Sequence, residues 1–515
     1  TLSGALSGIY DTCVEEGIEL IDMRHEQATA NAATGYAMVT GKPGVTMVTE
    51  GPGVINMAPG IATAYYACAP IIGITTRTPL SYQEMGAIQE FDSRDMYKSV
   101  TKWIGYCLET RRVPEYVATA FRHATTGRKG PVLLDFPFET LALDVEEGQA
   151  PIIPPHRYRT DARPYGDPEL IKRATKLLLN AKRPGILIGS GVLSSSASQE
   201  LVQFAELLNI PVCYAIGGKG CIPDNHPLCG GPVGMDFGSI AGADVMLAIG
   251  VRFEEILGFG RGNFYAPYLK VISVDIEPTE IGRNRPLELG IWGDAKAVLT
   301  QLIQSAKEAP SNTKGRRADT KWVKNVKNTT KSVKETLQAG ALGAEKPIHP
   351  ARLGKEVFEF LGSDSYFVAD GGDIASHVIA LYQATFPGSF ISGHGTERLG
   401  HLGCGIPMAI GVKTAKPDKR VVVITGDGSF LLNASEIDTA VRHKKQIVVV
   451  VGNDCQWGMV RHEQQLTKRC EVCSILSEDA RYDKYAESMG ANPLASNSVI
   501  RSVRTTLAAR LFVCQ

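Results

Sequence analysis

The sequence predicts an α/β protein of three doubly wound domains, each a parallel sheet covered by helices. Two observations lead to this fold class. The chain has 515 residues, and at about 150 residues per domain this length predicts roughly three domains. Short apolar runs of strand length alternate with helical patterns along the chain, a rhythm that is typical of parallel sheets with covering helices.

The composition argues against several classes of protein. Lys and Arg total 54, and Asp and Glu also total 54, so the formal charge of zero argues against a dedicated nucleic-acid-binding protein. With 44% apolar and 21% charged residues, general disorder is not expected. The longest apolar runs, such as 447–451, fall well short of the ~20 residues of a membrane span. The spacing of the 11 cysteines indicates no disulfide framework, so we expect a cytoplasmic protein.

Residues 1–150 form the first predicted domain. Its apolar runs predict strands in the ranges 19–23, 44–49, 70–75 and 131–135. A helix rich in small residues is expected over 29–38, and the proline-rich stretch 151–168 predicts an extended linker. The chain begins at Thr1 without a Met and ends abruptly at Gln515, which is typical of a fragment of a longer protein.

Two further blocks repeat the rhythm, over 165–305 and 346–515. A linker is expected between them over 306–345, and its Lys-rich part predicts a solvated helix more readily than a surface for nucleic acid or membrane. The strands expected in these blocks are 185–189, 244–250, 270–275, 366–369, 420–425 and 447–451.

The third block contains a candidate phosphate site. The strand 420–425 runs into Gly426-Asp427-Gly428-Ser429, and a helix pattern follows over 431–441. Glycines let the backbone approach a ligand closely, and a helix N-terminus offers free N–H groups to an anion. The carboxylate of Asp427 adds a hard oxygen ligand for a divalent cation.

A second turn strengthens this hypothesis. The next apolar strand, 447–451, ends in Gly452-Asn453-Asp454. A strand–helix–strand unit of this length makes the two strands parallel neighbours, so their carboxyl ends lie side by side. Asp427 and Asp454 can therefore converge on one cation, and Mg²⁺ favours carboxylates together with substrate phosphates.

These two turns resemble the signature of thiamine diphosphate enzymes, in which a GDG turn is followed one unit later by a pair of Asn residues. Asp454 stands in place of the second Asn and preserves an oxygen ligand. The resemblance implies thiamine diphosphate and Mg²⁺ as cofactors. It implies that Asp427 and Asp454 bind the metal through their side chains and that Gln456 binds it through its carbonyl oxygen. Gly426, Gly428 and Ser429 would contact the diphosphate.

The first block carries a matching resemblance. The runs "RHEQATANAATGYA", "GKPGV" and "EGPGVINMAPGIATAY" resemble the pyrimidine-binding domain of acetolactate synthase and its relatives. In these enzymes a largely buried glutamate stabilises the imino form of the pyrimidine ring. The resemblance makes Glu26 that catalytic residue, places Gly51 in the cofactor's glycine turn and makes Gln89 an active-site residue. It also implies a strand and a glycine turn before Thr1.

Two more runs complete the resemblance. In "GHGTERLGHLGCGIPMAIG", Leu402 matches the bulky apolar residue that bends the cofactor, and the carbonyl of Gly400 would accept from its amino group. In "ADGGD", Gly372 and Asp373 resemble a second diphosphate-contacting turn. The family also implies a homodimer or homotetramer whose active sites lie between subunits.

The middle block resembles the central domain of the same family, which holds FAD in acetolactate synthases and ADP or coenzyme A in some relatives. The sequence leaves FAD, ADP and no ligand as open alternatives there. Gly189-Ser190-Gly191 after a strand is a weak indication of a dinucleotide site, and a structural turn is favoured.

The reaction is the least determined property. Acetolactate synthases carry a Trp where this chain has Glu463, and the pattern around it is closer to 2-hydroxyacyl-CoA lyases, in which Glu463 would move the substrate's hydroxyl proton. We therefore rank a 2-hydroxyacyl-CoA lyase first, forming an aldehyde or ketone plus formyl-CoA reversibly. An acetolactate synthase acting on pyruvate ranks second and an oxalyl-CoA decarboxylase third. A catalytically dead binding homologue is the remote alternative, and a surface glutamate is the ordinary explanation of Glu463.

Overall fold

The computed structural model describes residues 4–234, 240–262, 265–309, 317–339, 342–343, 348–379, 381–393, 399–496 and 510–514. The chain divides into two compact units. The first joins residues 1–161 to 365–375 and 399–515, and the second joins 162–364 to 376–398. The chain forms three parallel sheets with surrounding helices, as the sequence predicts, and the domain boundaries that we drew stay predictions.

The N-terminal sheet lies in the first unit and has the strand order β1-β2-β4-β3. Its strands are β1 (Gly44–Val48), β2 (Ile71–Arg77), β3 (Ile104–Tyr106) and β4 (Val132–Pro137), and the three pairings are parallel. Their buried residues form continuous apolar runs, as parallel strands covered on both faces require. Three of the four expected strands are therefore present.

The prediction of a strand over 19–23 is wrong. Residues 18–23 form no strand, although the segment carries apolar side chains. Its polar side chains hold it against the C-terminal part of the unit: Asp22 pairs with Arg442 at 2.7 Å, and Glu19 pairs with Lys445 at 2.7 Å. These side-chain contacts replace the backbone ladder that the apolar pattern predicted.

Six helices accompany this sheet among the described residues. They are α1 (Ser7–Glu15), α2 (Glu26–Thr40), α3 (Pro52–Ala67), α4 (Arg94–Tyr97), α5 (Val113–Thr125) and α6 (Phe138–Ala142). Helix α2 begins where the ring of His25 accepts the N–H of Gln27, and it ends at Gly41, whose φ of 69° supplies the left-handed turn of a C-cap. The predicted helix over 29–38 lies inside α2.

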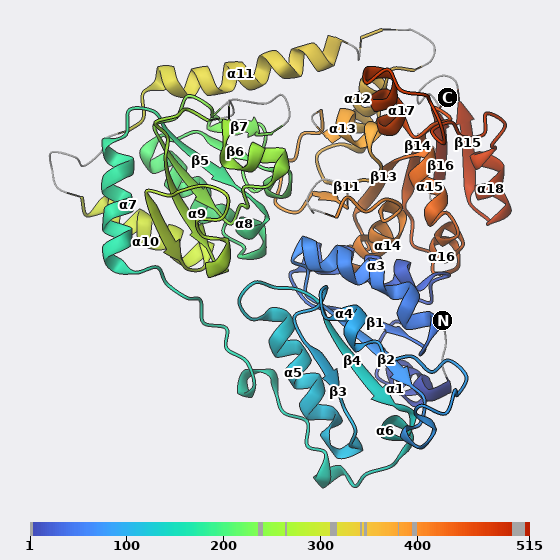
Figure 1. Ribbon diagram of the computed structural model, residues 1–515. Coiled ribbons are helices and arrows are strands. Elements are labelled where there is room, and N and C mark those ends of the chain that lie inside the picture. The colour runs from blue at the N-terminus through green and yellow to red at the C-terminus, as the bar shows by residue number, and fades with distance from the viewer. Residues whose placement is uncertain are drawn as a thin grey trace. The chain divides into compact units, whose positions relative to one another are not determined.

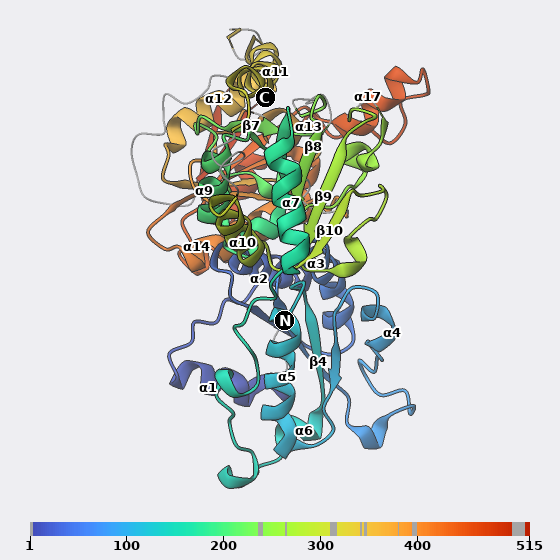
Figure 2. The ribbon, with the colours of Figure 1, turned by 90° about the vertical axis from the view of Figure 1, so that its left-hand side faces the viewer.

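The second unit contains the middle sheet, with the order β10-β9-β8-β5-β6-β7. Its strands are β5 (Pro184–Ile188), β6 (Val212–Tyr214), β7 (Cys229–Pro232), β8 (Val245–Ile249), β9 (Lys270–Asp275) and β10 (Leu289–Trp292). The helices α7 (Pro168–Asn180), α8 (Ser190–Ser194), α9 (Ser198–Leu208) and α10 (Ala295–Lys307) cover it, and Figure 2 shows α7 running alongside strands β8 and β9. The three strands expected here are all present.

The Lys-rich segment contains the expected helix, but this helix is not solvated on all sides. It forms helix α11 (Thr320–Ala339), and one face of that helix packs on the core of the middle sheet. Trp322 is buried and donates its indole N–H to the carbonyl of Pro184 at 2.8 Å, while Val323 and Val326 are buried beside it. Exposed side chains on this helix include those of Lys321, Lys324, Lys327 and Lys331, so α11 is an amphipathic helix of the second unit.

The C-terminal sheet of the first unit follows the order β11-β13-β14-β16-β15. Its strands are β11 (Ser365–Ala369), β13 (Arg420–Gly426), β14 (Val448–Gly452), β15 (Asn492–Ser496) and β16 (Arg510–Cys514), and a further short strand is β12 (Phe390–Ser392). The pairings from β11 to β15 are parallel. The three strands predicted for this block are present.

The helices of this block are α12 (Pro350–Leu361), α13 (Asp373–Ile379), α14 (Gly405–Ala415), α15 (Asp427–Leu432), α16 (Glu436–Arg442), α17 (Gly458–Leu466) and α18 (Tyr482–Ser488). The single helix expected over 431–441 is instead two short helices. The break lies at Asn433, whose side chain donates to the carbonyl of Gly403 at 2.8 Å. A polar tie to a distant turn therefore overrides the helical pattern.

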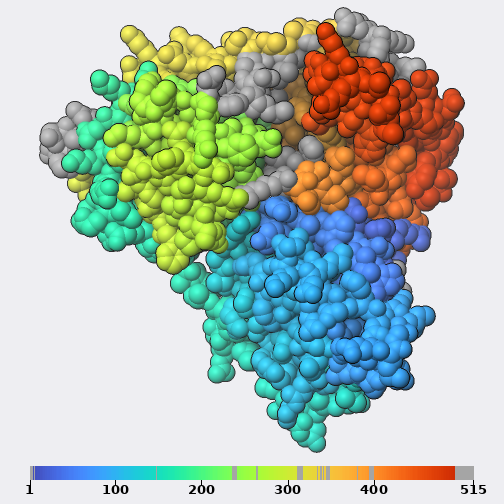
Figure 3. Space-filling view, viewed as in Figure 1, coloured from blue at the N-terminus to red at the C-terminus, as the bar shows by residue number. Residues whose placement is uncertain are grey.

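Helices α2 and α14 join the two sheets of the first unit (Figures 1 and 2). A Cβ on Gly35 would overlap the carbonyl oxygen of Met408, and a Cβ on Gly411 would overlap that of Ala32. Figure 3 shows blue N-terminal atoms beside orange C-terminal atoms on the surface of this unit. Only glycine permits so close a backbone approach.

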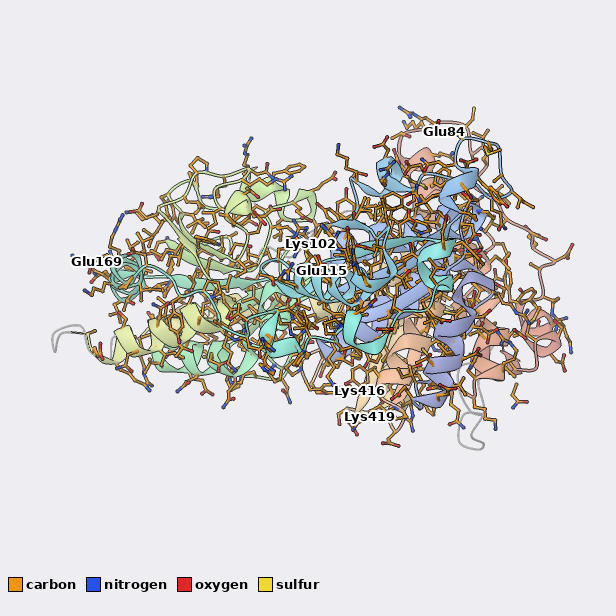
Figure 4. The ribbon with its side chains drawn as sticks, turned by 90° about the horizontal axis from the view of Figure 1, so that it is seen from below. Glu84, Lys102, Glu115, Glu169, Lys416 and Lys419 are labelled. Atoms are coloured by element: carbon orange, nitrogen blue, oxygen red, sulfur yellow. The ribbon has the colours of Figure 1, made fainter. Side chains whose placement is uncertain are left out.

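The C-terminal end of α14 is basic. Figure 4 shows Lys416 and Lys419 close together there, and Lys413 donates to the carbonyl of Lys419 at 2.7 Å. Cations at this end of a helix are favoured by the orientation of its peptide dipoles.

Across the described ranges, no helix combines the length and the apolar character that crossing a lipid bilayer requires.

The substitution Gly411→Ala tests the junction of α2 and α14. We expect it to lower the free energy of unfolding by about 1–3 kcal/mol, because the new methyl group overlaps backbone atoms that cannot move independently. The matched control is Gly8→Ala in α1, where an added Cβ has nothing within 4 Å. Urea unfolding of both variants measures the difference, and equal stability would contradict the tight crossing.

Candidate functional site

The Gly426–Ser429 turn holds a buried carboxylate. Asp427 opens helix α15 directly after β13 and is 1% exposed. Its Oδ2 atom is buried and has no hydrogen-bond partner in the structure. An unpartnered buried carboxylate oxygen is costly, so this atom is suited to a ligand that the protein itself does not supply.

Asp454 lies next to Asp427. Strands β13 and β14 pair in register, with Gly426 opposite Gly452, so the turns that follow them are neighbours. Gln456 donates its side-chain amide to Asp454 at 2.9 Å. Burial, and then the neighbouring Asp454, raises the pKa of Asp427 to about 7. Two carboxyl groups so placed favour a shared proton or cation.

This donor set fits Mg²⁺. Within the described part of the chain, no group of three or more His, Cys, Asp or Glu side chains could hold a metal ion. That result argues against a dedicated all-protein metal cage. Mg²⁺ instead commonly uses one or two carboxylates and completes its shell with water and phosphate oxygens. Asp427 and Asp454 match that pattern, with the orphan Oδ2 of Asp427 as the clearest sign.

Glycines give this site its close packing. A Cβ on Gly428 would lie 2.6 Å from the ring of Trp457, and a Cβ on Gly372 would lie 2.6 Å from the sulfur of Met459. A Cβ on Gly458 would lie 2.9 Å from Asp373 Oδ2 and 3.2 Å from Asp454 Oδ2. The structure therefore brings Gly372, Asp373 and Asp454 together around the start of α17, where His462 also contacts Asp373 at 3.3 Å.

A second buried aspartate, Asp370, organises the turns behind the site. It directly follows β11 and is 1% exposed. One oxygen accepts the hydroxyl of Ser429 at 2.8 Å and the N–H of Gly403 at 3.1 Å, and the other accepts the N–H of Gly405 at 3.1 Å. Asp370 thus ties the GDGS turn to the turn that precedes α14.

Ser429 takes part in this network through its side chain. Its hydroxyl donates to Asp370 and accepts the N–H of Gly403 at 2.9 Å. Both contacts are internal to the protein, so the hydroxyl positions the turn. We still predict that Ser429 contacts the diphosphate, through its backbone.

Gly400 and Leu402 flank a well-anchored histidine. Gly400 has a φ of 61°, and Leu402 is half-buried. Between them, His401 contacts Gln27 of α2 through Nε2 at 2.8 Å and the hydroxyl of Thr63 of α3 through Nδ1. Burial lowers the pKa of His401. The turn that carries Leu402 is therefore fixed to both N-terminal helices.

Glu26 is the first residue of α2 and is 5% exposed. Its Oε2 accepts a hydrogen bond from the side chain of Asn56 in α3 at 3.1 Å. A buried carboxyl group at a helix N-terminus is held in one orientation by this contact and by the helix itself. These properties suit the proton-holding role that the resemblance assigns to Glu26.

Gly51 and Gln89 lie against each other. Gly51 caps α3 with a φ of 58°, and a Cβ there would lie 2.7 Å from the carbonyl oxygen of Gln89. Gln89 itself has a φ of 62° and belongs to an exposed loop, whose Glu84 lies near the outer edge of the molecule in Figure 4. Glu90 stabilises this loop by accepting three of its backbone N–H groups.

The loop is anchored at its end by a buried ion pair. Arg77 donates to Asp135 at 2.6 Å, and the two side chains are 6% and 1% exposed. Ser93 adds a hydrogen bond to the same carboxylate at 3.0 Å. Ser93 stands four positions after Gln89, so this hydrogen bond ties the end of the loop to the sheet.

Glu463 is exposed on α17. Gln456, in contrast, is tied at both ends of its amide, since its oxygen accepts from Arg461 at 2.6 Å while its nitrogen donates to Asp454. These contacts involve only the side chain of Gln456. The group that the resemblance assigns to the metal is its backbone carbonyl, which they do not use.

The dinucleotide indication in the middle sheet is best explained by packing. A Cβ on Gly191 would lie 2.6 Å from Gly250 Cα, and Gly191 donates its N–H to the carbonyl of Gly250 at 3.0 Å. Gly189 is equally close to Gly250. These glycines allow two backbone segments to touch, so their spacing needs no nucleotide to explain it.

Sequence reasoning missed three residues. Asp370 lies in the run "ADGGD" directly after a predicted strand, and this position could have indicated a residue of the site. His401 stands between two predicted cofactor residues. Glu436 had no local signal, because its partners lie far away in the chain.

Three family models match the chain. One described as the N-terminal TPP binding domain of thiamine pyrophosphate enzymes matches residues 2–96. The model of their central domain matches 171–302, and the model of their C-terminal TPP binding domain matches 370–511.

Similar proteins share almost the whole length. A probable acetolactate synthase large subunit of Methanococcus aeolicus is 35% identical over 506 residues, which cover 95% of this chain and 83% of that protein. An acetolactate synthase large subunit of Corynebacterium glutamicum is 32% identical over 471 residues, covering 90% and 73%. A probable acetolactate synthase of Mycobacterium bovis is 30% identical over 494 residues, covering 96% and 87%.

The substitution Asp427→Ala tests the metal site. We expect the variant to fold, because it removes an unpartnered buried oxygen and a repulsive neighbour of Asp454. It should lose most of the rise in melting temperature that Mg²⁺ and thiamine diphosphate together give the unaltered protein, since ligand-dependent stabilisation scales with affinity. The control is Asp479→Ala, an exposed carboxylate of the same unit. An equal rise in both variants would contradict the assignment.

Proposed function

The chain belongs to the thiamine pyrophosphate enzyme family, and from this membership we propose that it is an acetolactate synthase, which decarboxylates pyruvate and joins the remaining fragment to a second keto acid. The observation that carries the proposal is the similarity, over 90% or more of the chain, to proteins named acetolactate synthase. The family membership itself makes the chain a thiamine diphosphate-dependent enzyme that forms C–C bonds.

The similarity favours our second sequence-based hypothesis over the first. A 2-hydroxyacyl-CoA lyase was ranked first because Glu463 stands where acetolactate synthases carry a Trp. In the structure Glu463 is exposed on α17, which agrees with the ordinary explanation of a surface glutamate. An assay with the substrates of the lyase and of oxalyl-CoA decarboxylase tests these two alternative reactions.

The site residues near the C-terminal sheet and those near the N-terminal sheet have different proposed roles. When bound, thiamine diphosphate supplies a nucleophilic carbon and an electron sink next to a carbonyl group. We propose that Asp427, Asp454 and the carbonyl of Gln456 hold Mg²⁺ and, through it, the diphosphate. The buried, unpartnered Oδ2 of Asp427 and the in-register pairing of β13 with β14 support this assignment.

Glu26 serves the other end of the cofactor. We propose that its carboxyl group holds a proton at N1′ of the pyrimidine ring. Its burial and its single orientation, fixed by Asn56, support this role because both keep water from replacing the contact. Gly51 and Gln89 would then border the same ring, since the two residues touch.

Three further properties stay predictions from the resemblance. They are the homodimer or homotetramer with active sites between subunits, FAD or ADP in the middle domain, and the roles of Gly400 and Leu402.

Replacing Glu26 by Gln tests the catalytic assignment. We expect turnover to fall by about 10²–10⁴-fold, because the amide cannot exchange a proton with the ring, while cofactor affinity stays within a few fold. The control is Glu16→Gln, which alters an exposed glutamate between α1 and α2. Steady-state rates and cofactor titrations separate the two quantities. Undiminished turnover in Glu26→Gln would disprove the role of Glu26.

A side-by-side assay tests the substrate. With Mg²⁺ and thiamine diphosphate, we expect pyruvate alone to yield acetolactate and carbon dioxide. Formyl-CoA with an aldehyde, and oxalyl-CoA, should give no product above the rate of protein-free controls. Product from either CoA substrate with none from pyruvate would overturn the proposed reaction in favour of one of the two CoA alternatives.

A further inference from the structure

Glu436 is a fully buried carboxylate that the sequence analysis does not place in the site. It opens helix α16 and is 0% exposed. Its two oxygens accept the N–H of Arg24 at 3.1 and 3.2 Å, and Oε1 also accepts the N–H of His25 at 3.0 Å. Within its own helix, Oε2 accepts the hydroxyl of Thr439 at 2.6 Å.

The two backbone donors to Glu436 lie directly before the predicted catalytic residue. Arg24 and His25 immediately precede Glu26, and His25 caps the helix that Glu26 begins. The residues before them form no strand, so no sheet ladder sets the path of the backbone at this point. The carboxylate of Glu436 binds this backbone directly, at the two residues before the predicted catalytic residue.

The contact also demands the ionised, full-length side chain. Each of the three groups that face it is a hydrogen-bond donor, and charge-assisted bonds of this kind are the stronger ones. A glutamine would turn an NH₂ group toward one or more of these donors, and an aspartate would fall short of them. Burial raises the pKa of Glu436, while the hydrogen bonds from Thr439, Arg24 and His25 oppose that rise.

We propose that Glu436 is a positioning residue for Glu26: by binding the backbone N–H groups of Arg24 and His25, it fixes the entry into α2 and hence the position of the Glu26 carboxyl group. This inference rests on the proposed role of Glu26. A displacement of about 1 Å at a reacting group can cost about 10²-fold in rate, so a residue that prevents it matters even without touching the cofactor.

The same helix offers a matched control. Asp438 lies two positions after Glu436 and also holds Arg24, but by an ion pair to its side chain at 2.6 Å. The Asp438 side chain is 19% exposed and the Arg24 side chain 54% exposed. Surface ion pairs contribute little to stability. Asp438→Asn therefore loosens the same residue without releasing any backbone N–H group.

The first experiment uses the full chain without cofactor. Amide hydrogen exchange, followed by mass spectrometry, reports on the peptide that contains Arg24 and His25. We expect this peptide to exchange at least about ten times faster in Glu436→Gln than in the unaltered protein, because its N–H groups lose their acceptor. Asp438→Asn should leave the exchange unchanged. Equal protection in all three proteins would overturn the proposal.

The second experiment measures the cofactor's C2 proton in the presence of Mg²⁺, by NMR after rapid mixing with D₂O. We expect exchange of this proton to be about 10²-fold slower in Glu436→Gln, slower still in Glu26→Gln and unchanged in Asp438→Asn. Bound cofactor, measured in parallel, should stay near one per chain. An unchanged exchange rate in Glu436→Gln, or a loss fully explained by lost cofactor, would overturn the proposal.

Two features of these experiments ensure that each result supports or overturns the proposal. The C2 exchange needs no keto acid, so a protein that fails to convert pyruvate refutes the proposed reaction without affecting this test. If Glu436→Gln does not fold, Thr439→Val replaces it, since that variant removes only the hydroxyl that steadies Oε2. We expect it to slow the C2 exchange several-fold, and an unchanged rate would overturn the proposal.

Discussion

The approach of two carboxylates at the ends of β13 and β14 is the constraint on which the site depends. In-register pairing of Gly426 with Gly452 forces Asp427 and Asp454 to be neighbours, although like charges repel. Burial adds to this cost, and a bound cation would relieve it. The surrounding turns serve the same arrangement, since Asp370 fixes the GDGS turn from behind and the glycines let Trp457 and Met459 close around it.

Much of the fold could be predicted because parallel strands are buried on both faces and so leave clear apolar runs. The strands β5, β8, β9, β11, β13 and β14 all coincide with such runs. The errors arose where a distant polar contact decides the backbone. Residues 18–23 have strand-like composition but are held by Arg442 and Lys445, and the helix expected over 431–441 breaks where Asn433 reaches Gly403. No local pattern carries such information.

The candidate site shows the same division. Asp427 and Asp454 could be paired from the sequence, because strand order alone brings their turns together. The supports of the site could not: Glu436 and His401 act on residues that lie hundreds of positions away in the chain. The substrate was the hardest property, because it was inferred from the single residue Glu463, and that side chain is exposed on a helix where its presence has an ordinary explanation. Similarity along the whole chain carried more weight than one position.

The glycine contact between α2 and α14 has a consequence for how the protein is made. The ribosome releases α2 early, but its partner face on α14 follows only after the entire middle sheet has been synthesised. During that interval the alanine- and glycine-rich face of α2 lacks its partner, which is the condition under which nascent chains associate wrongly or recruit chaperones. The first unit can complete its core only after its C-terminal sheet has been synthesised, whereas the middle sheet is built from one nearly continuous segment and can fold while the chain is still growing.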